Sequence, residues 1–154
     1  MAATFDFRES NGAGETVTSG ISNVNFGSVD SPNITPATNP VAAGDNSFEK
    51  WIRAHYSGTF TSIANLRFWK SAGAFVTGED IKASVDDTYA TPVATTSVLA
   101  TVTIPTTEGT ALNPAPPSGN PEFSGYITMQ LQTTVSTPPG AVNQKTFTLK
   151  YDET

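Results

Sequence analysis

Apolar and polar residues alternate most regularly over residues 47–71. Two runs in this stretch, 48–56 and 66–69, have the period of two that is typical of β-strands, and the polar steps around Gly58 predict a turn between them. We therefore expect an antiparallel hairpin. One face is predicted to hold the apolar residues Ile52, Ala54, Tyr56, Leu66 and Phe68, and the other Trp51, Arg53, His55, Arg67 and Trp69.

Similar alternation predicts strands elsewhere in the chain. The expected strands cover 81–85, 98–104, 126–135 and 146–151, and a weaker apolar patch covers 17–26. The last two strands flank the turn signal at 137–140, so they are predicted to form a second antiparallel hairpin. Phe5 and Phe7 alternate with charged residues before a glycine-containing break, which predicts for residues 1–16 either a short first strand or an N-terminal arm.

Two tracts lack this alternation and are rich in proline. Residues 29–46 and 105–122 carry a proline or glycine every few positions, which keeps a chain extended and irregular, so both are predicted to be long surface loops. About seven or eight strands in 154 residues, without a convincing amphipathic helix, predict a single all-β domain over 1–154. The expected fold is an immunoglobulin-like or jelly-roll antiparallel β-sandwich.

Composition and charge narrow the classes of partner. Only 14% of the residues are charged, the net charge is −6 and the pI is near 4.5, so nucleic acid and anionic membranes are not expected as partners. The absence of cysteine excludes disulfides and thiolate chemistry and favours folding in a reducing cytoplasm. Neither an export signal nor an apolar run long enough to cross a bilayer is recognisable, so we expect a protein made in the cytoplasm.

Candidate catalytic groups are sparse. His55 is the only histidine and lies on a predicted strand without a supporting nucleophile motif, so we interpret it as a surface or hydrogen-bonded residue. The densest acidic positions are 79–80 and 86–87, but adjacent strand residues point to opposite faces and do not converge on one bond. Oxygen-bearing side chains suited to calcium flank the first proline-rich tract without the spacing of an EF-hand: Asp30, Asn33, Asp45 and Asn46. We expect no enzyme, no cofactor and no metal site.

The mixture of aromatic rings and cations on the outward face of the first hairpin is typical of a contact surface. The residues predicted to bind a partner are Trp51, Arg53, Arg67, Trp69, Phe5 and Phe7. Each tryptophan buries on the order of 150–250 Å², so two exposed tryptophans would call for a partner to cover them. The alternative for at least one of them is a place in the sandwich core, where many such domains carry a tryptophan.

Several segments resemble the virion structural proteins of tailed bacteriophages, particularly small head decoration or cement proteins. These segments are 46–53, 58–60, 63–69, 138–140 and 145–153, within a resemblance that spans roughly residues 20–154. The resemblance implies a β-sandwich on the outer capsid surface of the virion, where it binds the major capsid protein and copies of itself and reinforces the shell. A trimer would suit a three-fold site, with the Phe5-containing segment and the proline-rich loops reaching neighbouring subunits.

Two other hypotheses stay open at this point. The chain could be a carbohydrate-binding module, free or within a phage tail or fibre, in which Trp51 and Trp69 stack on a glycan. It could also be a tail or neck component, which differs from a head decoration protein only in its place in the particle.

Overall fold

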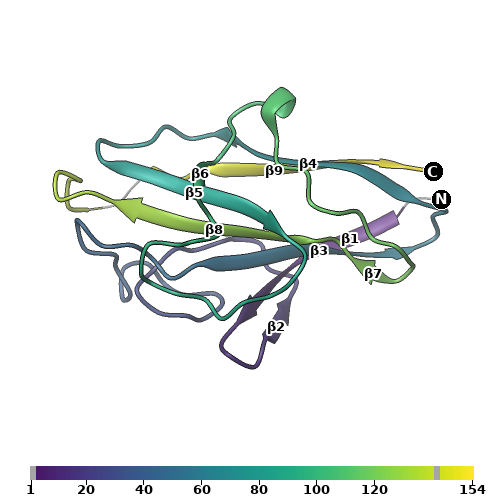
Figure 1. Ribbon diagram of the computed structural model, residues 1–154, viewed down its shortest axis with the longest axis horizontal. Coiled ribbons are helices and arrows are strands. Elements are labelled where there is room, and N and C mark those ends of the chain that lie inside the picture. The colour runs from purple at the N-terminus through teal and green to yellow at the C-terminus, as the bar shows by residue number, and fades with distance from the viewer. Residues whose placement is uncertain (1–2, 141–142) are drawn as a thin grey trace.

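The computed structural model describes residues 3–140 and 143–154 and forms two antiparallel sheets of unequal size (Figure 1). The strands are β1 (Ala3–Asn11), β2 (Thr16–Ser19), β3 (Lys50–Gly58), β4 (Ile63–Ala72), β5 (Glu79–Asp86), β6 (Val102–Thr103), β7 (Glu122–Phe123), β8 (Tyr126–Thr133) and β9 (Thr146–Glu153). The large sheet has the order β2-β1-β3-β8-β5-β6, with β7 also paired to β3, and the small sheet consists of β4 and β9. The predicted all-β antiparallel sandwich is confirmed.

The core lies between the two sheets and is built from the faces that the alternation predicts. Ile52, Ala54 and Tyr56 on β3 and Leu66 and Phe68 on β4 are all at most 2% exposed. Residues of β5 and β8 join them, and half-buried residues of β9 pack against the same clusters. The predicted inward faces are therefore correct.

The predicted pairing of these strands is wrong. β3 belongs to the large sheet and pairs with β1, β7 and β8, whereas β4 pairs with β9 in the small sheet. The chain crosses from one sheet to the other at residues 59–62, so the two apolar faces meet across the core instead of lying on one side of a hairpin. Period-two alternation specifies which side of a strand is buried, and both arrangements satisfy it.

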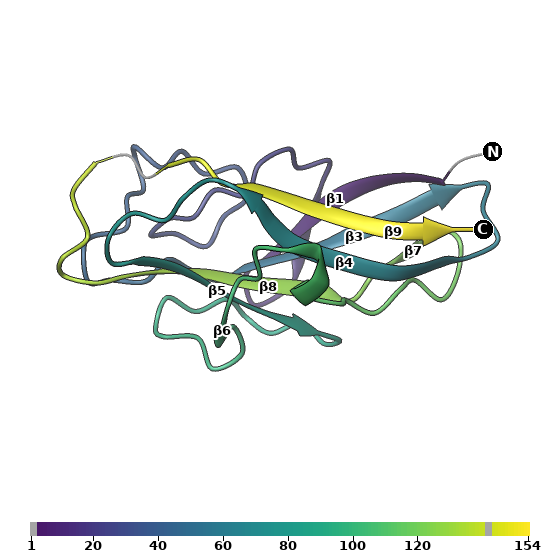
Figure 2. The same cartoon turned by 90° about the horizontal axis from the view of Figure 1, so that it is seen from above.

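The second predicted hairpin is also wrong, for the same reason. β8 lies between β3 and β5 in the large sheet, while β9 pairs with β4. Residues 134–145, partly outside the described ranges, connect the two sheets. The fold thus places β9 at an edge of the small sheet, and Figure 2 shows it between β4 and β1 when the molecule is seen from above.

The N-terminal segment is a strand of the large sheet and not an arm. β1 pairs with β3 from Ala3↔Gly58 to Ser10↔Trp51, and with β2 on its other side. Phe7 packs from β1 onto the buried core clusters. The predicted strand over 98–104 is limited to β6, because only Val102 and Thr103 pair with β5, and the predicted common face is wrong, since Val98 is 86% exposed while Ala100 is fully buried.

Both proline-rich tracts are irregular and run over the domain. In the first, the Ser31 carbonyl accepts a hydrogen bond from Lys50 Nζ at 2.8 Å. In the second, which contains the short 3₁₀ helix η1 (Glu108–Thr110), the backbones of Leu112 and Phe68 exchange two hydrogen bonds. Among the described residues, no helix has the length and hydropathy that a bilayer span requires.

Candidate functional site

The structure separates the residues that were predicted to share one contact face. Trp51, Arg53 and His55 lie on the outer face of the large sheet, because their neighbours on β3 point into the core. Arg67 and Trp69 lie by the same rule on the outer face of the small sheet. The two groups therefore occupy opposite sides of the sandwich and form no common surface.

Trp51 is fully buried on the outer side of the large sheet. Its ring lies edge-on to Tyr89 and Tyr126, with ring centroids 5.3 and 5.5 Å away, and its indole N–H donates to Glu49 at 3.3 Å. Tyr89 belongs to the segment between β5 and β6, which crosses this face. Trp51 has no surface left for a partner, whereas Trp69 is half-buried.

The segment that covers Trp51 is held in place by hydrogen bonds with two buried polar side chains, Gln130 on β8 and Glu49 just before β3. Gln130 donates to the carbonyls of Val93 and Thr95, and the Ser97 hydroxyl donates to Glu49. Gln130 and Thr128 are fully buried although alternation assigns them to the outer face. This second buried layer was missed because polar residues in a strand are normally solvent-facing.

A cluster of cations and rings lies beside this layer on the same outer face. We call Arg8, Arg53, His55, Phe123 and Tyr126 the arginine–aromatic surface. The Arg53 guanidinium carbon lies 3.9 Å from the Phe123 ring centroid and 4.5 Å from that of Tyr126. That of Arg8 lies 5.2 Å from the Phe123 centroid, and the His55 and Phe123 ring centroids are 4.8 Å apart. A guanidinium group that stacks on aromatic rings in this way is held in one orientation, and it covers the apolar faces of the rings.

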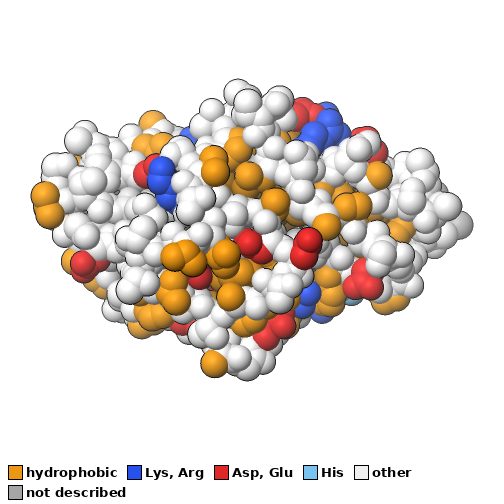
Figure 3. Space-filling view, viewed as in Figure 1, with side chains coloured by type: hydrophobic (Ala, Val, Ile, Leu, Met, Phe, Trp, Pro, Cys, Tyr) orange, Lys and Arg blue, Asp and Glu red, His pale blue; other side chains and the backbone are white. Residues whose placement is uncertain are grey.

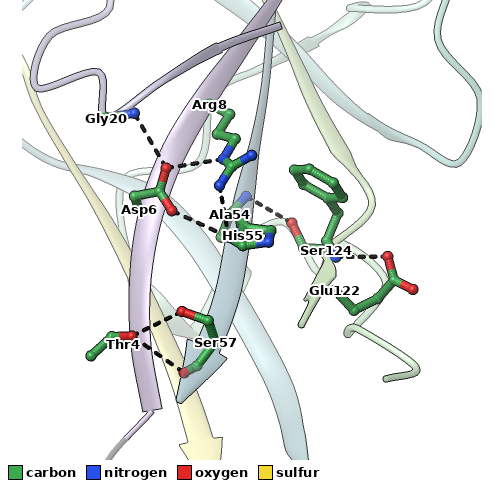
Figure 4. Close-up of polar contacts among 10 residues, drawn as sticks. Thr4, Asp6, Arg8, Gly20, Ala54, His55, Ser57, Glu122 and Ser124 are labelled. Atoms are coloured by element: carbon green, nitrogen blue, oxygen red, sulfur yellow. Dashed lines mark hydrogen bonds and ion pairs between the residues drawn. The ribbon is translucent and has the colours of Figure 1, made fainter. Parts of the chain in front are cut away.

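Asp6, Arg8 and His55 point toward one another from β1 and β3 (Figure 4). His55 Nδ1 lies 3.0 Å from Arg8 Nη2 and 3.3 Å from Asp6 Oδ1, and Arg8 Nε donates to Asp6 at 3.0 Å. Burial acts to raise the pKa of the Asp6 carboxyl, but the hydrogen bonds from Arg8 and the Gly20 backbone outweigh it and hold the pKa below its ordinary value. These contacts position Arg8 beside the rings.

The arginine–aromatic surface borders an open pocket of about 310 Å³. The pocket lies between β7, the start of β8 and the second proline-rich tract, and its lining includes Arg53, Asp87, Pro116, Glu122, Phe123 and Tyr126. Burial raises the pKa of Tyr126 to about 12, and the hydrogen bond from its hydroxyl to Glu15 acts in the same direction. The pocket presents fixed polar and aromatic groups to solvent.

Sequence reasoning found Arg53 but missed Arg8, Phe123 and Tyr126. Arg8 could have been found from its alternation with Phe7 once β1 was placed beside β3. Phe123 follows a proline-rich tract without periodicity, so the sequence carried no signal for its position. The pairing of β7 with β3, which sets His55 opposite Phe123, places the ring there.

The cations on the outer face of the small sheet, Arg67 and Lys150, form ion pairs with carboxylates of the same chain. Arg67 contacts Glu108 at 2.8 Å and Asp152 at 3.2 Å, and Lys150 contacts Glu108 at 2.8 Å. The hydrogen bond from Lys150 lowers the pKa of Glu108, and the charge of Arg67 adds to this effect. Arg67 therefore contributes to fixing η1 against the sheet.

β1 begins at the end of the domain that carries both termini (Figure 2), and Phe5 lies near its start, where its ring contacts Tyr151 of the small sheet. It is 41% exposed, and its ring centroid lies 5.5–5.8 Å from those of Phe7, Tyr56 and Tyr151. The exposed part of Phe5 is the open side of an aromatic cluster whose other members are half-buried or buried.

A larger apolar cavity of about 530 Å³ lies farther along β9, between the large sheet, β9 and the segment 21–26. The apolar residues that line it include Phe7, Ile21, Val24, Phe26, Ile52, Ile81 and Phe147. Glu79 and Lys145 are the charged residues in the lining, and they neutralise each other at 2.6 Å while at most 6% exposed. No pattern in the sequence indicates this cavity, because it arises from the mismatch in size between the two sheets.

Apolar side chains also gather across the middle of the face seen in Figure 3. Val85, Val93, Val98 and Val102 are each between 38% and 86% exposed. Partly exposed valines are normal on protein surfaces and do not by themselves indicate a binding site.

The described residues contain no group of three or more His, Asp or Glu side chains placed to hold a metal ion. Comparisons of the chain with models of protein families, with curated proteins and with solved structures found no match.

Proposed function

We propose that the protein is a non-enzymatic structural protein of a tailed-bacteriophage virion, and that it binds the outer capsid surface as a decoration protein. Its partners in this proposal are the major capsid protein and neighbouring copies of itself. The resemblance of residues 20–154 to such proteins supplies the class, and the geometry of the arginine–aromatic surface supplies the contact.

The observation that carries the proposal is the stacking of Arg53 between Phe123 and Tyr126 at the rim of an open pocket. Arginine and tyrosine are enriched among the residues that dominate protein–protein binding energies. Because the guanidinium group is held by two rings and by Glu15 at 3.2 Å, it loses little conformational freedom when a partner docks. A protruding side chain of the capsid protein would fill the pocket beside it.

The alternative of a carbohydrate-binding module required Trp51 and Trp69 on one exposed surface, and the two side chains do not share one. Trp51 is sealed beneath the segment that carries Tyr89, and Trp69 lies on the other side of the sandwich. The two tryptophans therefore cannot stack on one sugar chain. A tail or neck location uses the same kind of protein contact and is distinguished by where the protein is found in the particle.

Binding to capsids tests the proposal directly. Particles assembled from the phage genome with the reading frame of this chain deleted are mixed with purified protein and sedimented. We expect stoichiometric co-sedimentation, and we expect Arg53→Ala to lower the affinity by roughly tenfold or more, as for a central interface arginine. Arg67→Ala, on the opposite side, is the matched control and should bind normally. Absence of binding, or binding only at tails, would overturn the head-decoration proposal.

A further inference from the structure

One edge of the small sheet is open. In the register of β4 and β9, Phe68 lies opposite Leu149 and Lys70 opposite Phe147. The backbones of Phe68 and Lys70 are engaged on the far side, with Leu112 and Pro105 at 2.8–2.9 Å. These are therefore non-hydrogen-bonded pairs of the ladder, so the backbone groups of Phe147 and Leu149 point away from β4.

Tyr151, two residues farther along, has its backbone on the same side as Leu149. Outside the ladder between β4 and β9, no hydrogen bond within residues 3–140 and 143–154 reaches the backbone N–H or C=O of Phe147, Leu149 or Tyr151. A row of unpaired donors and acceptors is a template for another strand. One common protection of an edge is missing from β9, since its eight residues contain no proline.

The space beside this edge is apolar. The 530 Å³ cavity adjoins Phe147 at one end of β9, and Phe5 with Tyr151 forms the aromatic cluster at the other end. Because the side chains of Phe147, Leu149 and Tyr151 face the core, an added strand in register would direct alternate side chains into the same interior. Among the described residues, the charged groups in the cavity lining are Glu79 and Lys145, which are paired with each other.

We propose that β9 accepts an extended segment of a partner protein as a third strand of the small sheet. The segment carries large uncharged apolar residues at alternate positions, one of which enters the cavity while another covers Phe5. Main-chain hydrogen bonds to Phe147, Leu149 and Tyr151 supply affinity, and the cavity supplies specificity, as in other strand-addition complexes. This inference does not depend on capsid binding through Arg53, and only the choice of co-produced proteins in the crosslinking test rests on the proposed function.

The geometry favours an isolated segment over a folded sheet. β9 packs over β1 and β3 (Figure 2), and β2 follows β1 on the side away from β3, so the large sheet extends beyond the open edge of β9. The β9 edge of a second copy would bring its own β1 and β2 into the space that these strands occupy. A single extended chain has no second layer and fits above β1.

Amide hydrogen exchange measured by NMR tests the open edge in the free protein. The amides of Thr148 and Lys150 point toward β4 and should be protected, whereas those of Phe147, Leu149 and Tyr151 should exchange roughly tenfold faster or more. Equal protection of all five amides in the monomer would overturn the proposal.

A strand tethered to the chain itself tests whether β9 accepts an additional strand, and the test does not rely on a weak intermolecular affinity. The chain is extended after Thr154 by an Asn-Gly turn and a segment in which leucine alternates with threonine, with leucines opposite Phe147, Leu149 and Tyr151. We expect the three exposed amides to become protected and the melting temperature to rise. The matched control exchanges the leucine and threonine positions, which directs the leucines to solvent and should remove both effects. An extension that leaves the amides unprotected would contradict the proposal.

Photo-crosslinking identifies the natural occupant. The full chain with p-benzoylphenylalanine in place of Phe5 is produced together with the other proteins of its particle and irradiated, and the crosslinked peptide is sequenced. A crosslink to an extended segment with alternating large apolar residues supports the proposal. A crosslink to β9 of a second copy, or the absence of any crosslinked partner, would overturn it. Loss of capsid binding in Arg53→Ala together with an unchanged crosslink would separate this inference from the proposed function.

Discussion

Lys50 and Glu9 form an ion pair inside the domain, on the sides of β3 and β1 that alternation assigns to the core. Their side chains are each 1% exposed and lie 2.7 Å apart, and Lys50 also donates to the Ser31 carbonyl. Glu9 accepts a further hydrogen bond from Asn11. The pair ties β1, β3 and the first proline-rich tract together, so both charges depend on their partner to remain buried.

Replacing only the lysine should be strongly destabilising. We expect Lys50→Met to lower the free energy of unfolding by about 3–5 kcal/mol at pH 7, because it leaves the Glu9 carboxylate buried without its counter-ion. The double variant Glu9→Gln with Lys50→Met removes both charges and should recover most of this loss. Urea unfolding followed by tryptophan fluorescence measures both values, and equal losses in the single and double variants would contradict the explanation.

Replacing Tyr56 by phenylalanine should stabilise the folded protein. Its ring is fully buried between Phe5 and Tyr151, and its hydroxyl has no hydrogen-bond partner among the described residues. Tyr56→Phe removes this unsatisfied group and should raise the free energy of unfolding by about 1 kcal/mol. Tyr126→Phe is the matched control, because the Tyr126 hydroxyl donates to Glu15, and it should lower stability. The same sign in both variants would count against this account.

At the scale of elements, the sequence predicted strand faces better than strand partners. The buried residues of β3 and β4 follow from alternation, since only one side of each strand can face the core. Which strand lies beside which depends on contacts between distant segments, and here β3 lies between β1 and β8 while β4 lies beside β9. Both predicted hairpins failed because a crossing between sheets and a hairpin have the same periodicity.

The candidate site was predictable only where a single strand determines it. The outward position of Arg53 follows from β3 alone, but the cover over Trp51 comes from the segment of Tyr89, which has no periodic pattern. The open edge of β9 could not be predicted, because edge status depends on the whole strand order. The sequence therefore predicted the outward position of Arg53 but not the open edge of β9.

The turn after β4 provides an element-scale prediction. Gly73 has a φ of +87°, and a Cβ atom at this position would lie 2.2 Å from the Gln144 carbonyl oxygen and 2.8 Å from the Lys145 Cα. Gly73→Ala must therefore push the start of β9 away from the end of β4, and we expect a loss of more than about 1 kcal/mol. Gly109→Ala, which meets nothing within 4 Å, should change stability by less than about 0.5 kcal/mol. Thermal unfolding compares the two, and similar melting temperatures would refute the close-approach argument.

At the scale of the whole molecule, the unequal size of the two sheets explains both the cavity and the open edge of β9 at which a partner strand is proposed to bind. The two-stranded small sheet covers β3 and part of its neighbours, and loops cover some of the remaining inner face of the large sheet. The cavity lies between the large sheet, β9 and the segment 21–26, where these elements leave space unfilled. A third strand would complete the small sheet, so stability and partner binding are expected to increase together.

Alkaline pH should destabilise the whole domain through its buried tyrosines. Burial raises the pKa of Tyr126 to about 12, and burial also raises the pKa values of Tyr56 and Tyr89. Since an unfolded tyrosine has a pKa of about 10, the stabilisation is complete below pH ~10 and is lost as the pH rises through the folded value. Each such group steepens the decline by at most about 1.4 kcal/mol per pH unit.

Urea unfolding at a series of pH values, with tyrosinate absorbance recorded in parallel, measures this decline. Between pH ~10 and ~12, Tyr126→Phe should show a shallower loss of stability than the unmodified chain, because one raised pKa has been removed. Below pH ~9 the two chains should differ by a constant amount, which reflects the lost hydrogen bond to Glu15. Parallel curves over the entire range would show that Tyr126 ionises in the folded chain as readily as in the unfolded one. That result would contradict the sealed layer around Trp51, to which the Tyr126 ring belongs.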